Sequence, residues 1–114
     1  MAPWYLDPQS GGNKIPPIMY ENIVTQINSY AAMRPWASKY QLKARFRGYF
    51  CYLDAVEEDG TIFPIGRLRY FSMGSWSLAF YTYSNERYEP CLFASGNWFG
   101  SIEEAIDICE SYLV

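Results

Sequence analysis

The sequence predicts a single α+β domain over residues 1–114, in which a four-stranded antiparallel meander sheet carries an N-terminal and a C-terminal helix on one face (α-β-β-β-β-α). Apolar residues recur at helical spacing near both ends of the chain. Between these regions, segments rich in aromatic and β-branched residues are separated by short turn sequences. At 114 residues, the chain can bury roughly two-thirds of its unfolded surface, so one core suffices without metal or disulfides.

Residues 1–17 are predicted to form an ordered N-terminal arm, and residues 18–114 the α+β body. Prolines and glycines interrupt regular structure along the whole arm. The segment Trp4-Tyr5-Leu6 is nevertheless apolar. We expect this segment to dock on the body, because an ordered arm must recover the entropy of fixing it.

The first helix is predicted to begin at Pro16-Pro17 and to end before Arg34-Pro35, since proline suits the first position of a helix. Its apolar residues are spaced three and four apart: Tyr20, Ile23, Val24, Ile27, Tyr30 and Ala31.

The first two strands are predicted as one hairpin from Leu42 to Phe71, with its turn at Glu58-Asp59-Gly60. Two registers are possible. A two-residue turn pairs Phe50 with Arg69, whereas a three-residue loop with a left-handed glycine pairs Phe50 with Leu68 on the core side. We prefer the three-residue loop, because it keeps the apolar side chains of both strands together.

Two further strands are predicted after the hairpin. A turn at Ser72-Met73-Gly74 leads into Trp76–Tyr83, and a second turn at Ser84-Asn85-Glu86-Arg87 leads into Tyr88–Phe93. These segments complete the predicted four-stranded meander.

The closing helix is predicted from a capping box, Ser101-Ile102-Glu103-Glu104. The Ser101 hydroxyl can accept from the amide three residues on, while the Glu104 carboxylate can reach back to the start of the helix. The apolar stripe behind it is Ile102, Ala105, Ile106, Cys109, Tyr112 and Leu113.

The helix-free face of the sheet is predicted to combine positive charge with large rings. Six of the nine Lys and Arg residues lie between positions 39 and 69, and strand side chains alternate between faces. Our candidate binding residues on this face are Arg45, Arg47, Arg67 and Arg69 as anion contacts and Tyr49, Phe71, Tyr81 and Tyr83 as ring contacts. Like charges facing one another across strands are unfavourable, and a large exposed apolar patch is uncommon on a monomer. We therefore expect something to cover this face or to bind to it.

Three kinds of cover are compatible with this pattern. The arm can fold over the face, or two copies can pack sheet to sheet, with arginine stems lying on rings. An anionic ligand or protein partner can bind the arginines. Single-stranded nucleic acid can stack on the rings, but the arginine-rich strand does not match the signature of sheet-platform RNA binders in order or spacing. The formal charge of −3 also argues against a general nucleic-acid coat.

Composition excludes several chemistries. The chain has no histidine, which excludes Ser-His and Cys-His nucleophile pairs and histidine-containing metal sites. No catalytic residue, metal ligand or cofactor is therefore assigned. The remaining enzyme alternative is a histidine-free hydrolase or transferase that uses carboxylates or Cys91.

The cysteines indicate a reducing compartment. Cys51, Cys91 and Cys109 are odd in number, widely spaced and set in apolar patterns, so we interpret them as reduced thiols. The N-terminus lacks the basic start and apolar run of a signal peptide, and no apolar stretch approaches about 18 residues. We expect a cytoplasmic protein without a membrane segment.

Three segments together resemble a family of small bacterial proteins known only as hypothetical: Trp4–Pro16, Arg45–Tyr52 and Phe80–Pro90. The resemblance covers nearly the whole chain. It implies a bacterial, cytoplasmic source and brings no activity, cofactor or catalytic residue.

The sequence thus favours a binding or interaction module. It is expected to self-associate, or to bind an anionic ligand or protein, through the arginine-rich face. Nucleic-acid binding on the same face is the alternative, and an enzyme is the less favoured class.

Overall fold

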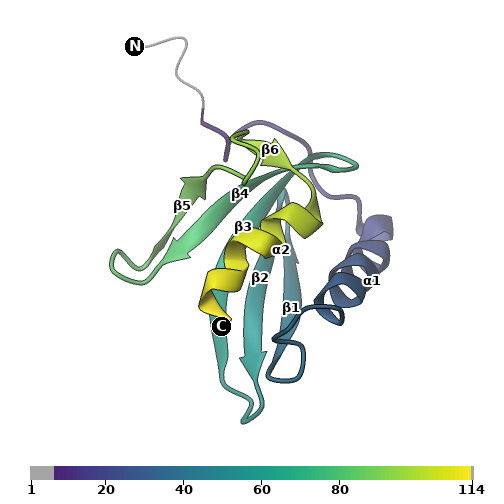
Figure 1. The fold of residues 1–114 in the computed structure, drawn as a ribbon. Helices are drawn as coiled ribbons and strands as arrows, with labels where there is room; N and C mark the ends of the chain where they lie inside the picture. Colours follow the sequence, from purple (N-terminus) through teal and green to yellow (C-terminus); the bar gives the residue numbers. More distant parts are fainter. Residues whose placement is uncertain (1–6, 114) are drawn as a thin grey trace.

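The computed structural model describes residues 7–113, which form an antiparallel sheet with two helices on one face (Figure 1). The predicted docking of Trp4-Tyr5-Leu6 lies outside the described residues. In chain order, the elements are η1 Pro17–Met19, α1 Tyr20–Ala31, β1 Tyr40–Arg47, β2 Phe50–Glu57, β3 Ile62–Ser72, β4 Ser75–Thr82, β5 Arg87–Cys91, β6 Phe99–Gly100, α2 Ile102–Cys109 and η2 Glu110–Tyr112. The predicted α+β class is confirmed.

The sheet has six strands, so the predicted four-stranded meander is wrong in strand number. Five strands follow the chain in the order β1-β2-β3-β4-β5, and the short β6 pairs with β4. All of these pairs are antiparallel. The difference comes from β6 and from an unpredicted hairpin early in the chain.

The segment predicted as the first strand is broken by a two-residue turn. Arg47 pairs with Phe50, which leaves Gly48 and Tyr49 as the loop. Gly48 has φ of 59°, a left-handed value that glycine adopts without steric cost. Because the loop is tight, the side chains after it emerge on the opposite face from the one that simple alternation predicts.

The predicted three-residue loop between β2 and β3 is present, but the register extrapolated from it is wrong. Gly60 is left-handed with φ of 89°, and the Glu57 amide donates to the Thr61 carbonyl at 2.9 Å. The register then shifts by one residue at a bulge between Leu53 and Asp54. Phe50 consequently pairs with Arg69 and not with Leu68.

Both helices are stabilised as the sequence predicts. α1 follows Pro16-Pro17 and buries Ile23, Ile27 and Ala31. α2 carries the complete capping box: the Glu104 amide donates to the Ser101 hydroxyl at 3.1 Å, and the Ser101 amide donates to the Glu104 carboxylate at 2.9 Å. These helices bury their apolar stripes against the same face of the sheet.

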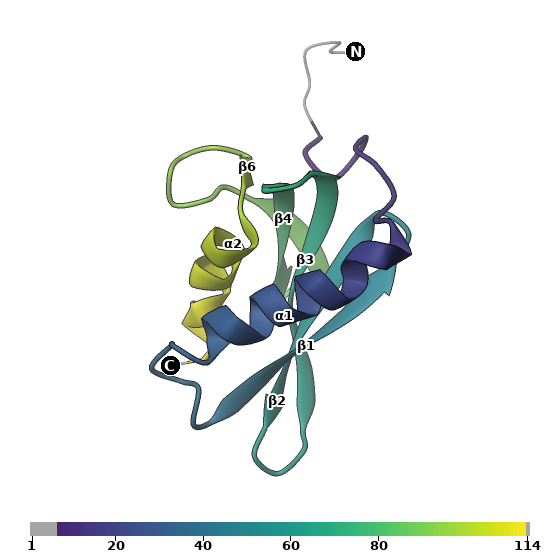
Figure 2. The same cartoon turned by 90° about the vertical axis from the view of Figure 1, so that its right-hand side faces the viewer.

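Stacked rings join the helices to the sheet at both ends of the core. Tyr20 at the start of α1 stacks on Phe46 of β1 with centroids 4.1 Å apart. Phe80 of β4 stacks on Tyr112, which follows α2, at 4.6 Å. Figure 2 shows α1 slanting across the sheet in front of the strands. The helices therefore cover one face and partly shield the β1 edge.

A polar row joins the two helices to each other. It consists of three side-chain pairs, Gln26 with Glu103, Tyr30 with Asp107, and Arg34 with Glu110. The Trp36 indole also donates to the Glu110 carboxylate at 2.9 Å. Three of the acidic residues near the C-terminus thus have partners within the chain.

Candidate functional site: the Arg–aromatic face

Two rows of paired residues cross the helix-free face of the sheet. One row runs Arg45–Tyr52–Arg67 and the next runs Arg47–Phe50–Arg69, each crossing β1, β2 and β3. We call these six residues the Arg–aromatic face. Four of them were predicted as anion contacts, whereas Phe50 was expected on the core side and Tyr52 was not singled out.

The expected clash of like charges across neighbouring strands does not occur. The arginines lie on β1 and β3, and β2 separates them with its rings. Alternation then turns Cys51 inward, where it is fully buried. The sequence feature that we missed was Gly48. Its tight turn places β2 between the arginines of β1 and those of β3.

The guanidinium groups lean over the rings between them. Arg67 lies 4.4 Å from the Phe50 centroid and 5.1 Å from that of Tyr88. Arg69 lies 4.8 Å from the Phe50 centroid. Such contacts contribute about 0.5–1 kcal/mol each at exposed sites, and they hold the side chains in place.

The other two predicted anion contacts differ in their surroundings. Arg45 donates to both oxygens of the Asp54 carboxylate, at 2.6 and 3.2 Å. The hydrogen bond to Asp54 raises the pKa of Arg45. Arg47 is exposed and makes no hydrogen bond or ion pair with residues 7–113. Asp54, which sequence reasoning did not single out, therefore neutralises one of the four arginines.

The N-terminal arm covers the β3–β4 part of this face. Arg67 donates through Nε to the Gln9 side chain at 2.9 Å, and Gln9 donates to the buried Ser77 hydroxyl at 2.7 Å. Arg69 donates through Nε to the Gly11 carbonyl at 2.7 Å. The arm thus provides part of the cover that the sequence led us to expect.

The arm leaves the outer ends of these arginines available. Both Arg67 and Arg69 use Nε, and their terminal nitrogens make no hydrogen bond within residues 7–113. The paired terminal N–H groups of a guanidinium match a carboxylate or phosphate. The arginines are therefore positioned by the fold while part of their donor capacity remains free of partners in the described chain.

The predicted ring contacts fall into two groups around the arginines. Arg69 lies 4.4 Å from the ring centroid of Tyr49, which is in the β1–β2 turn. Phe71 packs edge-on against Phe99 at 4.9 Å, beneath Gly12 of the arm. Tyr49 and Phe71 therefore flank the Arg47–Phe50–Arg69 row of the face.

Of the other two ring contacts, Tyr81 extends the face toward β5, whereas Tyr83 lies just beyond β4 with its ring also 5.3 Å from that of Tyr112. Tyr88 lies 5.5 Å from Tyr52 and 5.0 Å from Tyr81, and Tyr83 follows at 4.8 Å from Tyr81. The Tyr83 hydroxyl donates to the Pro64 carbonyl at 2.6 Å. Burial raises the pKa of Tyr83 to about 12, so this tyrosine stays neutral and keeps its donated hydrogen bond at ordinary pH.

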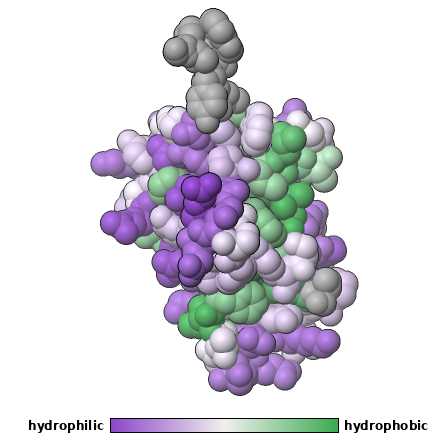
Figure 3. Space-filling model, turned by 90° about the vertical axis from the view of Figure 1, so that its left-hand side faces the viewer, coloured by the Kyte–Doolittle hydropathy of each residue, from purple (hydrophilic) through white to green (hydrophobic). Residues whose placement is uncertain are grey.

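Figure 3 shows the surface of the molecule from the β5 side. In Figure 3, hydrophilic side chains occupy much of the left and centre of the view, and hydrophobic ones gather toward the right.

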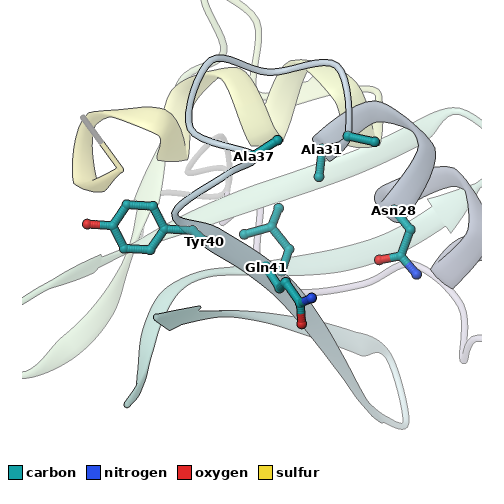
Figure 4. Close-up of a pocket in the computed structure, with 7 residues that line it drawn as sticks. Asn28, Ala31, Ala37, Tyr40 and Gln41 are labelled. Carbon is teal, nitrogen blue, oxygen red and sulfur yellow. The ribbon is translucent and has the colours of Figure 1, made fainter. Parts of the chain in front are cut away.

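A separate hollow lies between the end of α1 and the start of β1 (Figure 4). It measures about 410 Å³ and is lined by residues that include Asn28, Ala31, Tyr40 and Gln41. None of its lining residues is charged. It does not include any residue of the Arg–aromatic face.

The cysteines do not form a reactive centre. All three are free thiols, and burial raises the pKa values of Cys51 and Cys109 to about 12. Burial also raises the pKa of the half-buried Cys91. Over residues 7–113, no three acidic or cysteine side chains gather in a way that could hold a metal ion.

Comparison of the chain with protein-family models, curated proteins and solved structures gave no significant match. Within the part of the chain that the structure describes, no helix has the length and apolar character needed to cross a bilayer.

Proposed function

We propose that this chain is a protein-interaction module that binds an acidic segment of a protein partner through the Arg–aromatic face. The observation that carries this proposal is the set of arginines that rings and the arm hold in place while their terminal nitrogens have no partner within residues 7–113. Side chains ordered in advance lose little freedom on binding, which favours affinity.

The spacing of the arginines suits an extended acidic segment. Arginines two residues apart on one strand are separated by about 7 Å, and the two arginine strands lie about 10 Å apart. Carboxylates at alternating positions of an extended chain have the same repeat of about 7 Å. Such a segment, laid along β2 between the two arginine strands, can place its acidic side chains between Arg67 and Arg69 on one side and Arg47 on the other.

Nucleic-acid binding is the weaker alternative for a geometric reason. Base stacking needs open ring faces. Phe50 already has Arg67 and Arg69 over its ring, and Tyr52 has Arg45 over its ring. The chain as a whole also carries a formal charge of −3. Both features favour an acidic protein segment over an oligonucleotide.

Direct stacking of this face on the same face of a second copy is unfavourable, because it brings the arginine arrays together. A homodimer, which the sequence also suggested, needs an acidic segment opposite the Arg–aromatic face of each copy. For the compartment, we propose the cytoplasm of a bacterial cell; the three free thiols support a reducing environment.

A titration with an acidic peptide tests the proposed function. The probe is a labelled peptide with glutamate at alternating positions, and the matched control peptide has lysine in their place. We expect saturable binding of the acidic peptide, shifts of the Arg67 and Arg69 Nε signals in NMR spectra, and weaker binding at high salt.

Two variants make the titration specific. Arg47→Glu should weaken binding at least tenfold, whereas Arg87→Glu, which reverses an arginine away from this face, should leave it within about twofold. Equal loss in both variants, equal binding of the lysine peptide, or tighter binding of an oligothymidylate would contradict the proposal. Melting curves of both variants establish that they are folded.

A further inference from the structure

The turn between β2 and β3 carries the densest group of negative charges that lack an ion pair. We call Glu57, Glu58 and Asp59 the acidic tip. None of these carboxylates forms an ion pair with residues 7–113, where the ion pairs are Arg34–Glu110, Arg45–Asp54 and Arg87–Glu89. The acidic tip and the Arg–aromatic face are thus complementary surfaces that do not meet within one chain.

We propose that the acidic segment recognised by the Arg–aromatic face is the acidic tip of a second copy of this chain, in a two-fold symmetric dimer. This inference rests on the proposed function and names its partner. The chemistry is the pairing of carboxylates with arginines whose terminal nitrogens have no other partner in the described chain.

The shape of the molecule permits this contact. The β2–β3 turn projects beyond the helices and forms the lowest part of the molecule in Figures 1 and 2. Glu58 and Asp59 are exposed, as are Gly60 and Thr61 beside them. A projecting loop of this kind can reach a neighbouring molecule without any change in the fold.

The acidic tip also keeps its charge and its conformation. The Asp59 carboxylate accepts a hydrogen bond from the Thr61 amide at 2.9 Å. This bond lowers the pKa of Asp59, which therefore stays ionised at neutral pH. Because the loop is ordered by its own hydrogen bonds, docking requires little further ordering.

Symmetry allows both contacts to form at once. Tyr52 and Glu58 are six residues apart on β2 and its loop. The Arg–aromatic face and the acidic tip are therefore separated by about 20 Å along the strand direction. A two-fold axis midway between them places the acidic tip of each copy on the Arg–aromatic face of the other copy. The same surface is used on both subunits, so the assembly closes as a dimer and does not grow into a fibre.

Charge-swapped variants provide the test. Arg47→Glu alters the Arg–aromatic face and Glu58→Lys alters the acidic tip, and neither side chain belongs to the ion pairs within residues 7–113. In each variant alone, positions 47 and 58 carry charges of the same sign at both contacts of the symmetric dimer, which weakens both contacts. In the mixed dimer, one contact is the native pair and the other is the swapped pair, so both are attractive.

Sedimentation or light scattering measures the mass of the unaltered chain, of each variant and of their mixture. We expect the unaltered chain at tens of micromolar to be a dimer at low salt, with a dissociation constant at least tenfold weaker in 1 M NaCl. Each variant should be a monomer, and an equimolar mixture should recover the dimer. Glu21→Lys, which makes the same charge change on α1, should leave the dimer intact.

Several outcomes would overturn the proposal. They are a monomeric unaltered chain, a dimer that persists in both variants, a mixture that stays monomeric, and assemblies larger than a dimer. The acidic-peptide titration, repeated on Glu58→Lys, separates the two proposals. If that variant binds the peptide while the unaltered chain is monomeric, the second-copy inference fails and the proposed function stands. If it does not bind the peptide, the proposed function fails as well.

Discussion

At the scale of single residues, the arginines of one face have different roles. Arg69 is held by two rings and by the Gly11 carbonyl. Arg47, in the same cross-strand row, has no such contact within residues 7–113. The first residue can stabilise the fold while its terminal nitrogens bind a partner, whereas the second is free to act in binding alone.

This difference predicts that replacement by alanine lowers the free energy of unfolding more at Arg69 than at Arg47. Arg69→Ala should lower the free energy of unfolding by about 1–2 kcal/mol, because it removes two ring contacts and one hydrogen bond. Arg47→Ala should change it by less than about 0.5 kcal/mol. Urea denaturation of both variants at neutral pH measures these values. Equal losses would show that the ring contacts do not hold Arg69 in solution.

At the scale of elements, the sequence predicts best where one local rule decides the structure. The capping box at Ser101 and the three-residue loop ending at Gly60 depend on neighbouring residues only, and both are present. The Gly48 turn was missed because the residues on both sides of it continue a strand-like pattern. The bulge between Leu53 and Asp54 also has no local signal, since it responds to packing across the sheet.

These two omissions explain what was missed at the candidate site. The arginines on β1 were placed on the helix-free face from alternation alone. Phe50 was assigned to the core because alternation was carried through Gly48, and its pairing with Arg69 could not be found without the bulge. The contact of Gln9 with Arg67 joins residues far apart in the chain, so no local pattern indicates it.

The arm offers a prediction at the same scale. Gly12 has φ of 77°, and a Cβ atom there would lie 2.4 Å from the Tyr70 carbonyl oxygen. Gly12→Ala should therefore detach the arm and break the hydrogen bond from the Asn13 amide to that oxygen. Hydrogen exchange should then show at least tenfold faster exchange at Asn13, with the core strands unchanged.

The control for the arm is Gly74→Ala. Gly74 is also left-handed, with φ of 76°, but an added Cβ atom there meets nothing within 4 Å. It carries the same backbone strain without the steric clash. Equal exchange at Asn13 in Gly12→Ala and in the unaltered chain would contradict the arm contacts described here.

At the scale of the whole molecule, an ion pair joins the segments that follow α1 and α2, Arg34 with Glu110. Glu110 accepts hydrogen bonds from Arg34 and Trp36, and the bond from Arg34 is the main cause of its lowered pKa. A carboxyl whose pKa is lower in the folded state stabilises the fold above its unfolded pKa of about 4.3. That contribution is lost as the pH falls through the folded pKa.

Glu110→Gln should reveal this dependence, because glutamine keeps an acceptor for Trp36 but removes the charge opposite Arg34. Near pH 7, the variant should be less stable than the unaltered chain by up to about 1 kcal/mol, a value limited by the partial exposure of the pair. The difference should shrink as the pH falls below about 4. Urea denaturation between pH 3 and 7 measures it, with Glu21→Gln as the control for removing an acidic residue that has no ion pair. A difference that stays constant across this range would show that the Arg34–Glu110 pair does not contribute to helix docking through its charge.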